Sequence, residues 1–132
     1  MMGKNLDKAK AFRASDEVRH YNCAQAVLCA YAEECGLTVD EAYDLAACFG
    51  SGMNMGSVCG AVTGSLMVIG RLKQGNGDKA LQAELYRRVK ENHDGLIDCR
   101  DLLRVMAEKG QQKRPHCDGM IYECLEILED IL

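Results

Sequence analysis

The sequence contains no tryptophan, only two phenylalanines and a single proline, and it lacks the alternating β-branched runs that are typical of strands. With so little proline, almost every segment is free to be helical. The chain shows no internal repeat, low-complexity tract or linker, which excludes a repeat array and indicates one domain over residues 1–132. Hydrophobic residues make up 48% and charged residues 27%, as in a folded globular protein.

Basic residues are also fewer than acidic ones: the chain has 16 Lys and Arg and 20 Asp and Glu, which gives a net charge of −4. This balance argues against nucleic acid or an anionic membrane as a partner. The N-terminal segment carries lysines and an aspartate where a secretory signal peptide would be apolar, so we expect a cytoplasmic protein. Residues 45–70 include no charge, but glycines and polar residues interrupt them, which favours a buried helix over a membrane span.

Apolar residues recur at helical spacing along most of the chain, which predicts an all-α single-domain bundle of about six to seven helices. Thr38 and Glu41 have the spacing of a capping box, and Asn22, Asp78 and Asp98 are suitable N-caps. The helices are expected over about 6–19, from 22 to before 36, 38–48, 58–72, from 78 onward, 99–107 and 117–132.

Eight cysteines are many for a chain of this size. In a reducing compartment they indicate metal binding, catalysis or plain burial. Half of them are predicted to lie in the first turn of a helix, where unpaired N–H groups and the helix dipole stabilise a thiolate. Such positions lower a cysteine pKa from about 8.5 to roughly 3.5–7.5, and they also suit an anionic metal–thiolate cluster. These four are Cys23, Cys59, Cys99 and Cys117, whereas core filling is expected for Cys29, Cys35, Cys48 and Cys124.

Glycines recur beside the second of these cysteines, at Gly56, Gly60 and Gly64, so that one face of the helix start has no side chains. This face allows close packing of another helix, binding of a cofactor or thiol partner beside Cys59, or a contact between two copies of the chain. A dinucleotide or P-loop phosphate site is not expected, because those fingerprints follow a strand.

Other chemistry-bearing residues are expected to have structural roles. Glu17 and His20 form a single Glu-x-x-His, whereas a di-iron bundle needs two, so a solvated helix face is expected. His116 is adjacent to Cys117 and is able to lower the pKa of that thiol or join a metal, although a loop histidine is common there. His93, Arg100, Lys113 and Arg114 are expected at helix ends or on the surface.

The sequence around the four helix-start cysteines resembles the C-GCAxxG-C-C family of redox-active proteins, small proteins with four cysteines and a CGAxxG motif. The resemblance spans roughly residues 10–131, and its segments are NCAQAVL, FGSGMNMGSVCGAVTG, CRDLL and HCDGMIYECLEIL. By position, it implies that the family's cysteines are Cys23, Cys59, Cys99 and Cys117. A similar domain occurs in split-Soret cytochromes, which add c-type haem, but the absence of C-x-x-C-H means that covalent haem is not implied here.

Three functions remain open at this point. In the first, the protein is a thiol-based oxidoreductase with an unidentified redox partner, and Cys59 is the attacking thiolate with Cys99 or Cys23 as its resolving thiol. Since the chain has no C-x-x-C, such a pair must meet through the fold, with Cα atoms within about 7 Å.

In the second, the four cysteines bind an iron–sulfur cluster or zinc, although their spacing matches no local ligand motif. In the third, the chain is a non-enzymatic helical assembly module whose cysteines only pack, and a homo-oligomer is left open.

Overall fold

The computed structural model describes residues 4–132. Within them the chain forms seven helices and no strand, which confirms the predicted all-α fold. The helices are α1 (Lys4–Ala14), α2 (Cys23–Ala30), α3 (Val39–Ala46), α4 (Gly60–Leu72), α5 (Lys79–Asn92), α6 (Cys99–Glu108) and α7 (Lys113–Ile131), with two short turns, η1 (Ala47–Phe49) and η2 (Gly52–Gly56).

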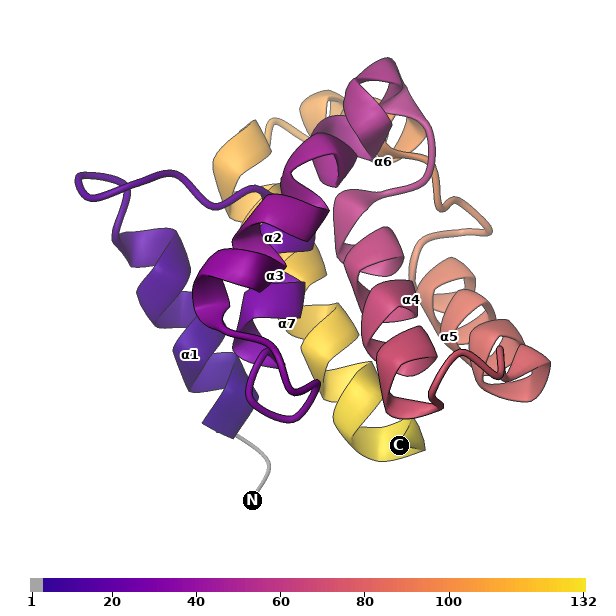
Figure 1. The fold of residues 1–132 in the computed structure, drawn as a ribbon. Helices are drawn as coiled ribbons and strands as arrows, with labels where there is room; N and C mark the ends of the chain where they lie inside the picture. The colour runs from indigo at the N-terminus through magenta and orange to yellow at the C-terminus, as the bar shows by residue number, and fades with distance from the viewer. Residues whose placement is uncertain (1–3) are drawn as a thin grey trace.

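Helix α2 is the centre of the bundle. All of its residues are buried, and it contacts α1, α3, α4 and α7. In Figure 1, α2, α4 and α7 begin at the upper end of the molecule and run downward, while α1 runs upward beside them and α6 lies across the upper end. The N-termini of α2, α4 and α7 therefore meet at one end of the fold, whereas α1 begins at the opposite end.

Two capping boxes determine where α2 and α3 begin. In α2, the Gln25 amide donates to the Asn22 side chain and the Asn22 amide donates to the Gln25 side chain, both at 2.8 Å. Thr38 and Glu41 make the same reciprocal pair at the start of α3, as predicted. The cap at Asn22 makes Cys23 the first residue of α2.

Three expected helix boundaries are wrong. The first helix ends at Ala14 and not near Arg19, so Glu17 and His20 lie in the connection that follows it and not on a helix face. The last helix begins at Lys113 and not near Cys117, because Pro115 lies within its first turn, where a helix does not need the proline amide. Cys117 is consequently in the second turn of α7. Helix α2 ends at Ala30, since the chain then turns and reaches Gly36 with a φ of +70°.

The glycine face of α4 allows α2 to approach closely, which confirms the packing prediction for two of the three glycines. A Cβ atom on Gly60 would lie 3.1 Å from Cys23 Cβ, and one on Gly64 would lie 2.9 Å from the Ala24 carbonyl oxygen. Gly56 differs, because its φ of +69° places it in the left-handed region. The close approach brings the start of α4 beside the start of α2.

Replacing Gly64 with alanine is expected to lower the free energy of unfolding by about 1–3 kcal/mol, because the new Cβ would push α4 away from α2. Gly70→Ala is the matched control in the same helix. A Cβ there meets nothing within 4 Å, so the loss of backbone freedom in the unfolded chain should stabilise the protein by about 0.5–1 kcal/mol. Urea unfolding of both variants measures the difference, and equal stabilities would contradict the close-packing account.

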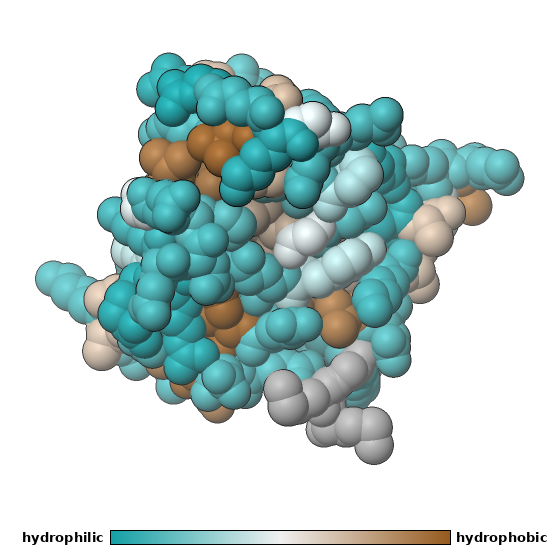
Figure 2. Space-filling model, turned by 180° about the vertical axis from the view of Figure 1, so that it is seen from behind, coloured by the Kyte–Doolittle hydropathy of each residue, from teal (hydrophilic) through white to brown (hydrophobic). Residues whose placement is uncertain are grey.

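Within residues 4–132, no helix combines the length and the apolar character that crossing a membrane requires. The face of the molecule opposite to that of Figure 1 is mainly hydrophilic, and its hydrophobic side chains form small separate patches (Figure 2). The apolar side chains are instead gathered in one core between α2, α4, α5 and α7.

Candidate functional site

A cavity of about 280 Å³ lies at the end of the bundle where α2, α4, α6 and α7 begin. The fold brings all four helix-start cysteines of the sequence analysis to its wall: Cys23, Cys59, Cys99 and Cys117. All are free thiols, and three are buried, whereas Cys117 is partly exposed. Residues separated by 36, 40 and 18 positions in the chain thus share one site.

An antiparallel bridge places two of these cysteines beside each other. Val58 pairs with Asp98, the Cys59 amide donates to the Ile97 carbonyl at 3.0 Å, and the Cys99 amide donates to the Ser57 carbonyl at 2.7 Å. Because side chains alternate along paired segments, Cys59 and Cys99 lie diagonally on the same face of the bridge. Each then begins a helix, Cys59 as the N-cap of α4 and Cys99 as the first residue of α6.

The segment before this bridge is a left-handed turn. Ser51, Gly52, Met53 and Asn54 all have φ values between 52° and 61°. This conformation costs residues that carry a Cβ about 1–2 kcal/mol each. A side chain at Gly52 would also collide with the Ser57 backbone, so this glycine is required. The turn returns the chain to the start of α4 and places Ser51 in the cavity wall.

Cys117 is the cysteine that the site favours as a thiolate. A hydrogen bond with the Cys23 thiol lowers the pKa of Cys117 to about 7, against the opposing effect of burial. The positive charges of Arg13 and Lys113 lower it further, and the negative charge of Asp118 raises it slightly. The thiolate is stabilised by groups on α1, α2 and α7 together, and not by a helix N-terminus.

The prediction of a low pKa at the other three positions is wrong. Burial raises the pKa of Cys59 to about 12, although the backbone amides of Ala61 and Val62 at the start of α4 favour its thiolate. Burial also raises the pKa of Cys99. The hydrogen bond to Cys117, followed by burial, raises that of Cys23. The loss of hydration exceeds the effect of the helix start at these positions.

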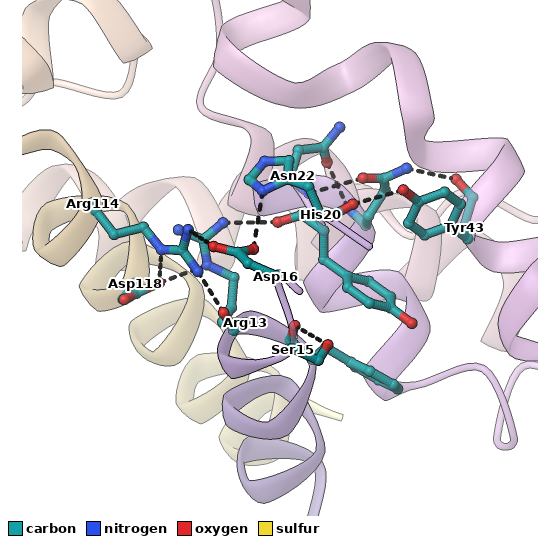
Figure 3. Close-up of polar contacts among 11 residues, drawn as sticks. Arg13, Ser15, Asp16, His20, Asn22, Tyr43, Arg114 and Asp118 are labelled. Atoms are coloured by element: carbon teal, nitrogen blue, oxygen red, sulfur yellow. Dashed lines mark hydrogen bonds and ion pairs between the residues drawn. The ribbon is translucent and has the colours of Figure 1, made fainter. Parts of the chain in front are cut away.

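A chain of ion pairs links α1 and the segment that follows it to α7 (Figure 3). The buried Arg13 guanidinium donates to Asp118 at 2.6 Å through Nε and to the Tyr21 carbonyl at 2.8 Å through Nη1. Arg114 continues the chain to Asp16 at 2.6 Å and donates to the Arg13 carbonyl. The arrangement keeps the guanidinium of Arg13 in the cavity wall, near Cys117.

Arg13 is a site residue that the sequence analysis missed. It lies in α1, a helix of mostly polar residues, and its partner Asp118 is 105 positions away, so nothing in the local sequence marks it. What distinguishes Arg13 is that its side chain is almost fully buried, which is rare for arginine and can be recognised only in the folded structure.

The remaining predicted residues are distributed as follows. Cys29, Cys35 and Cys124 fill the core as expected, but Cys48 is exposed, so the core prediction for it is wrong. His93 pairs with Glu123 at 2.8 Å, away from the cysteines. His20 pairs with Asp16 and, like His116, lines the cavity, whereas Glu17 is exposed. Arg100 packs against Gly56.

The metal alternative was tested on the arrangement of possible ligands. In the part of the chain that the structure describes, no three His, Cys, Asp or Glu side chains are placed to hold one metal ion. Four thiols in one wall are nevertheless the donors that thiophilic metals prefer, so metal content belongs in the experimental test.

Comparison with known proteins supplies a family match. Residues 21–131 match the family model described as "Putative redox-active protein (C_GCAxxG_C_C)". This range extends from just before α2 to the end of α7 and contains the four cavity cysteines, whereas α1 with Arg13 precedes it. No curated protein and no solved structure matches the chain.

Proposed function

This chain belongs to the C_GCAxxG_C_C family of redox-active proteins, and from that premise we propose that it carries out thiol–disulfide exchange through Cys117 and Cys23. The observation that carries the proposal is that both side chains line one cavity, Cys23 buried and Cys117 partly exposed, where their interaction raises the pKa of Cys23 and lowers that of Cys117. Cys117 is then the attacking group and Cys23 the resolving group. A pKa near the ambient pH is optimal for an attacking thiol.

The exchange begins when the Cys117 thiolate attacks one sulfur of a substrate disulfide. A new S–S bond forms, the substrate S–S bond breaks, and the first half of the substrate leaves as a thiolate. Cys23 then gives its proton to that thiolate and attacks Cys117 Sγ, which releases the second half. The protein dithiol is oxidised to a disulfide, and the substrate disulfide is reduced to two thiols.

The geometry couples these two steps. While Cys117 is a thiolate, its negative charge and its hydrogen bond raise the pKa of Cys23, so the resolving thiol stays protonated. Once Cys117 is part of a mixed disulfide, that charge is gone and the main cause of the raised pKa disappears. Cys23 is therefore released for attack only when there is a mixed disulfide to resolve.

We assign Cys59 and Cys99 to a second thiol pair in the same wall. Their diagonal placement across the bridge supports treating them as a pair, and burial keeps Cys59 protonated at neutral pH. In the alternative function, all four thiols bind an iron–sulfur cluster or a zinc ion. The experiment must distinguish this metal binding from thiol–disulfide exchange.

The test is disulfide mapping after equilibration in dithiothreitol buffers without air, together with iron and zinc analysis of the same sample. We expect a metal-free protein that loses two hydrogens and yields one Cys23–Cys117 disulfide. Cys48→Ser should leave this result unchanged, since Cys48 is exposed and outside the cavity. Stoichiometric iron or zinc, or a Cys23–Cys117 pair that stays reduced throughout the series, would overturn the proposal.

Two substitutions of Cys23 separate its hydrogen bond from its redox role. Cys23→Ser keeps a donor beside Cys117, so the pKa of Cys117 should stay near 7 while the disulfide is lost. Cys23→Ala removes the donor as well and should raise the pKa of Cys117 toward 9. Thiolate absorbance at 240 nm against pH measures both, and identical titrations of the two variants would show that the hydrogen bond has no effect.

A further inference from the structure

The cavity is positively charged at its wall. Among the residues that the structure describes, three cations line it, Arg13, Lys113 and Arg114, and no aspartate or glutamate does. The carboxylates that neutralise two of these cations, Asp118 and Asp16, pair with them outside the lining (Figure 3). An anion entering the cavity would therefore meet basic groups without meeting a carboxylate.

Lys113 is the cavity cation whose charge no carboxylate of residues 4–132 neutralises. It is exposed, it is the first residue of α7, and it makes no ion pair within residues 4–132. It lies one helical turn before Cys117, on the same face of α7. It lines the cavity together with Cys99 and Cys117, and its charge favours the thiolate at both positions.

The size of the cavity limits what enters it. A volume of about 280 Å³ is at the lower end of the range for small-molecule pockets, roughly 300–1,000 Å³. Cys117, the attacking thiolate, lines this cavity and is only partly exposed, so a substrate sulfur has to enter the cavity to approach it. A small molecule meets this requirement more readily than a disulfide on the surface of a folded protein.

We propose that the substrate of this site is a low-molecular-mass disulfide that carries carboxylates, bound with a carboxylate toward Lys113. The proposal rests on the exchange function proposed above and adds the substrate class. The carboxylate remains beside Lys113 while the Cys117 thiolate attacks the disulfide, so the attraction raises the rate by raising the local substrate concentration.

The experiment compares three probes of similar size: dithiodipropionate with two negative charges, hydroxyethyl disulfide with none, and cystamine with two positive charges. Each rate constant is measured at pH 8, where most of Cys117 is ionised and cystamine still carries its charges, in protein with Cys48→Ser. It is then divided by the rate constant of the same probe with 2-mercaptoethanol, which removes differences in intrinsic reactivity. We expect the normalised rate to be about tenfold higher for the anion than for the cation, with the neutral probe between them.

Two further measurements identify the origin of this preference. Salt at 1 M should remove most of it, because the Debye length falls to about 3 Å. Lys113→Gln should reduce the ratio of anion to cation about threefold. Lys109→Gln should leave it unchanged, because it alters the net charge equally at an exposed lysine outside the cavity wall.

The outcomes separate the two proposals. Equal normalised rates for the three probes would overturn the substrate class and leave the exchange function standing. A Lys113→Gln variant that slows all three probes by the same factor would also overturn it, since the lysine would then act on Cys117 alone. Failure of Cys117 to react with any probe would overturn the exchange function itself.

Discussion

At pH 7, iodoacetamide is expected to modify Cys117 a few hundredfold faster than Cys59, although both line the same cavity. With a pKa of about 7, roughly half of Cys117 is thiolate at this pH, whereas a pKa of about 12 leaves about one part in 10⁵ of Cys59 ionised. The more basic thiolate is the better nucleophile by about two orders of magnitude, which offsets part of this difference. Burial of Cys59 also hinders access of iodoacetamide, which slows its modification further relative to Cys117.

Mass spectrometry of alkylated peptides against time and pH measures these rates, in a Cys48→Ser background that removes the exposed thiol. The rate at Cys117 should rise with a midpoint near pH 7 and reach a plateau above pH 8. A midpoint near pH 9 would show that Cys23, Arg13 and Lys113 do not stabilise the thiolate. Cys117→Ser should remove the fast phase completely.

Alkaline pH is expected to destabilise the fold by about 3 kcal/mol at pH 10 through two core thiols alone. Burial raises the pKa of both Cys29 and Cys59 from 9.0 to about 12. A thiol whose pKa is raised in the folded state stabilises that state below pH 9, and the contribution is lost as pH rises toward 12. At pH 10 each group has lost about 1.4 kcal/mol. Tyr31, also raised to about 12, adds to the loss above pH 10.

Urea unfolding between pH 9.5 and 11, with a reductant and without air, tests this prediction. This window avoids pH 7–9, in which the ionisation of Cys117 changes the stability in the opposite direction. Because the pKa of Cys117 is lowered in the folded state, its thiolate stabilises the fold above pH 9, and this contribution is lost as the pH falls toward 7. Cys29→Ala should reduce the slope of the unfolding free energy by up to about 1.4 kcal/mol per pH unit, whatever its effect on stability at pH 7. A free energy of unfolding that is constant over this window would mean that these thiols ionise equally in both states.

The positions of the site cysteines could be anticipated because they depend on local signals. Asn22 with Gln25 makes a capping box at one helix start, and the glycines that follow Cys59 indicate a closely packed one. Caps and apolar spacing depend on a few neighbouring residues, so they are visible without the fold. The expected start of α7 near Cys117 is wrong because proline is tolerated in the first turn of a helix, so Pro115 does not exclude a helix that begins at Lys113.

The choice of the reactive thiol could not be anticipated in the same way. A helix start favours a thiolate, and that reasoning selected Cys59. The fold buries Cys59 almost completely, and the loss of hydration has the larger effect on its pKa. Cys117, which is not at a helix start, is partly exposed and has both a thiol donor and cations from other helices nearby.

The sequence by itself determined the helical class and singled out the four cysteines that come together in the cavity, because helix periodicity and capping act over a few residues. Only the tertiary structure decided which cysteine pKa is lowered and which are raised. Hydration and charge depend on neighbours that are distant in the chain, such as Arg13 and Asp118 beside Cys117. The chemistry of this site therefore follows from packing, whereas its location follows from the sequence.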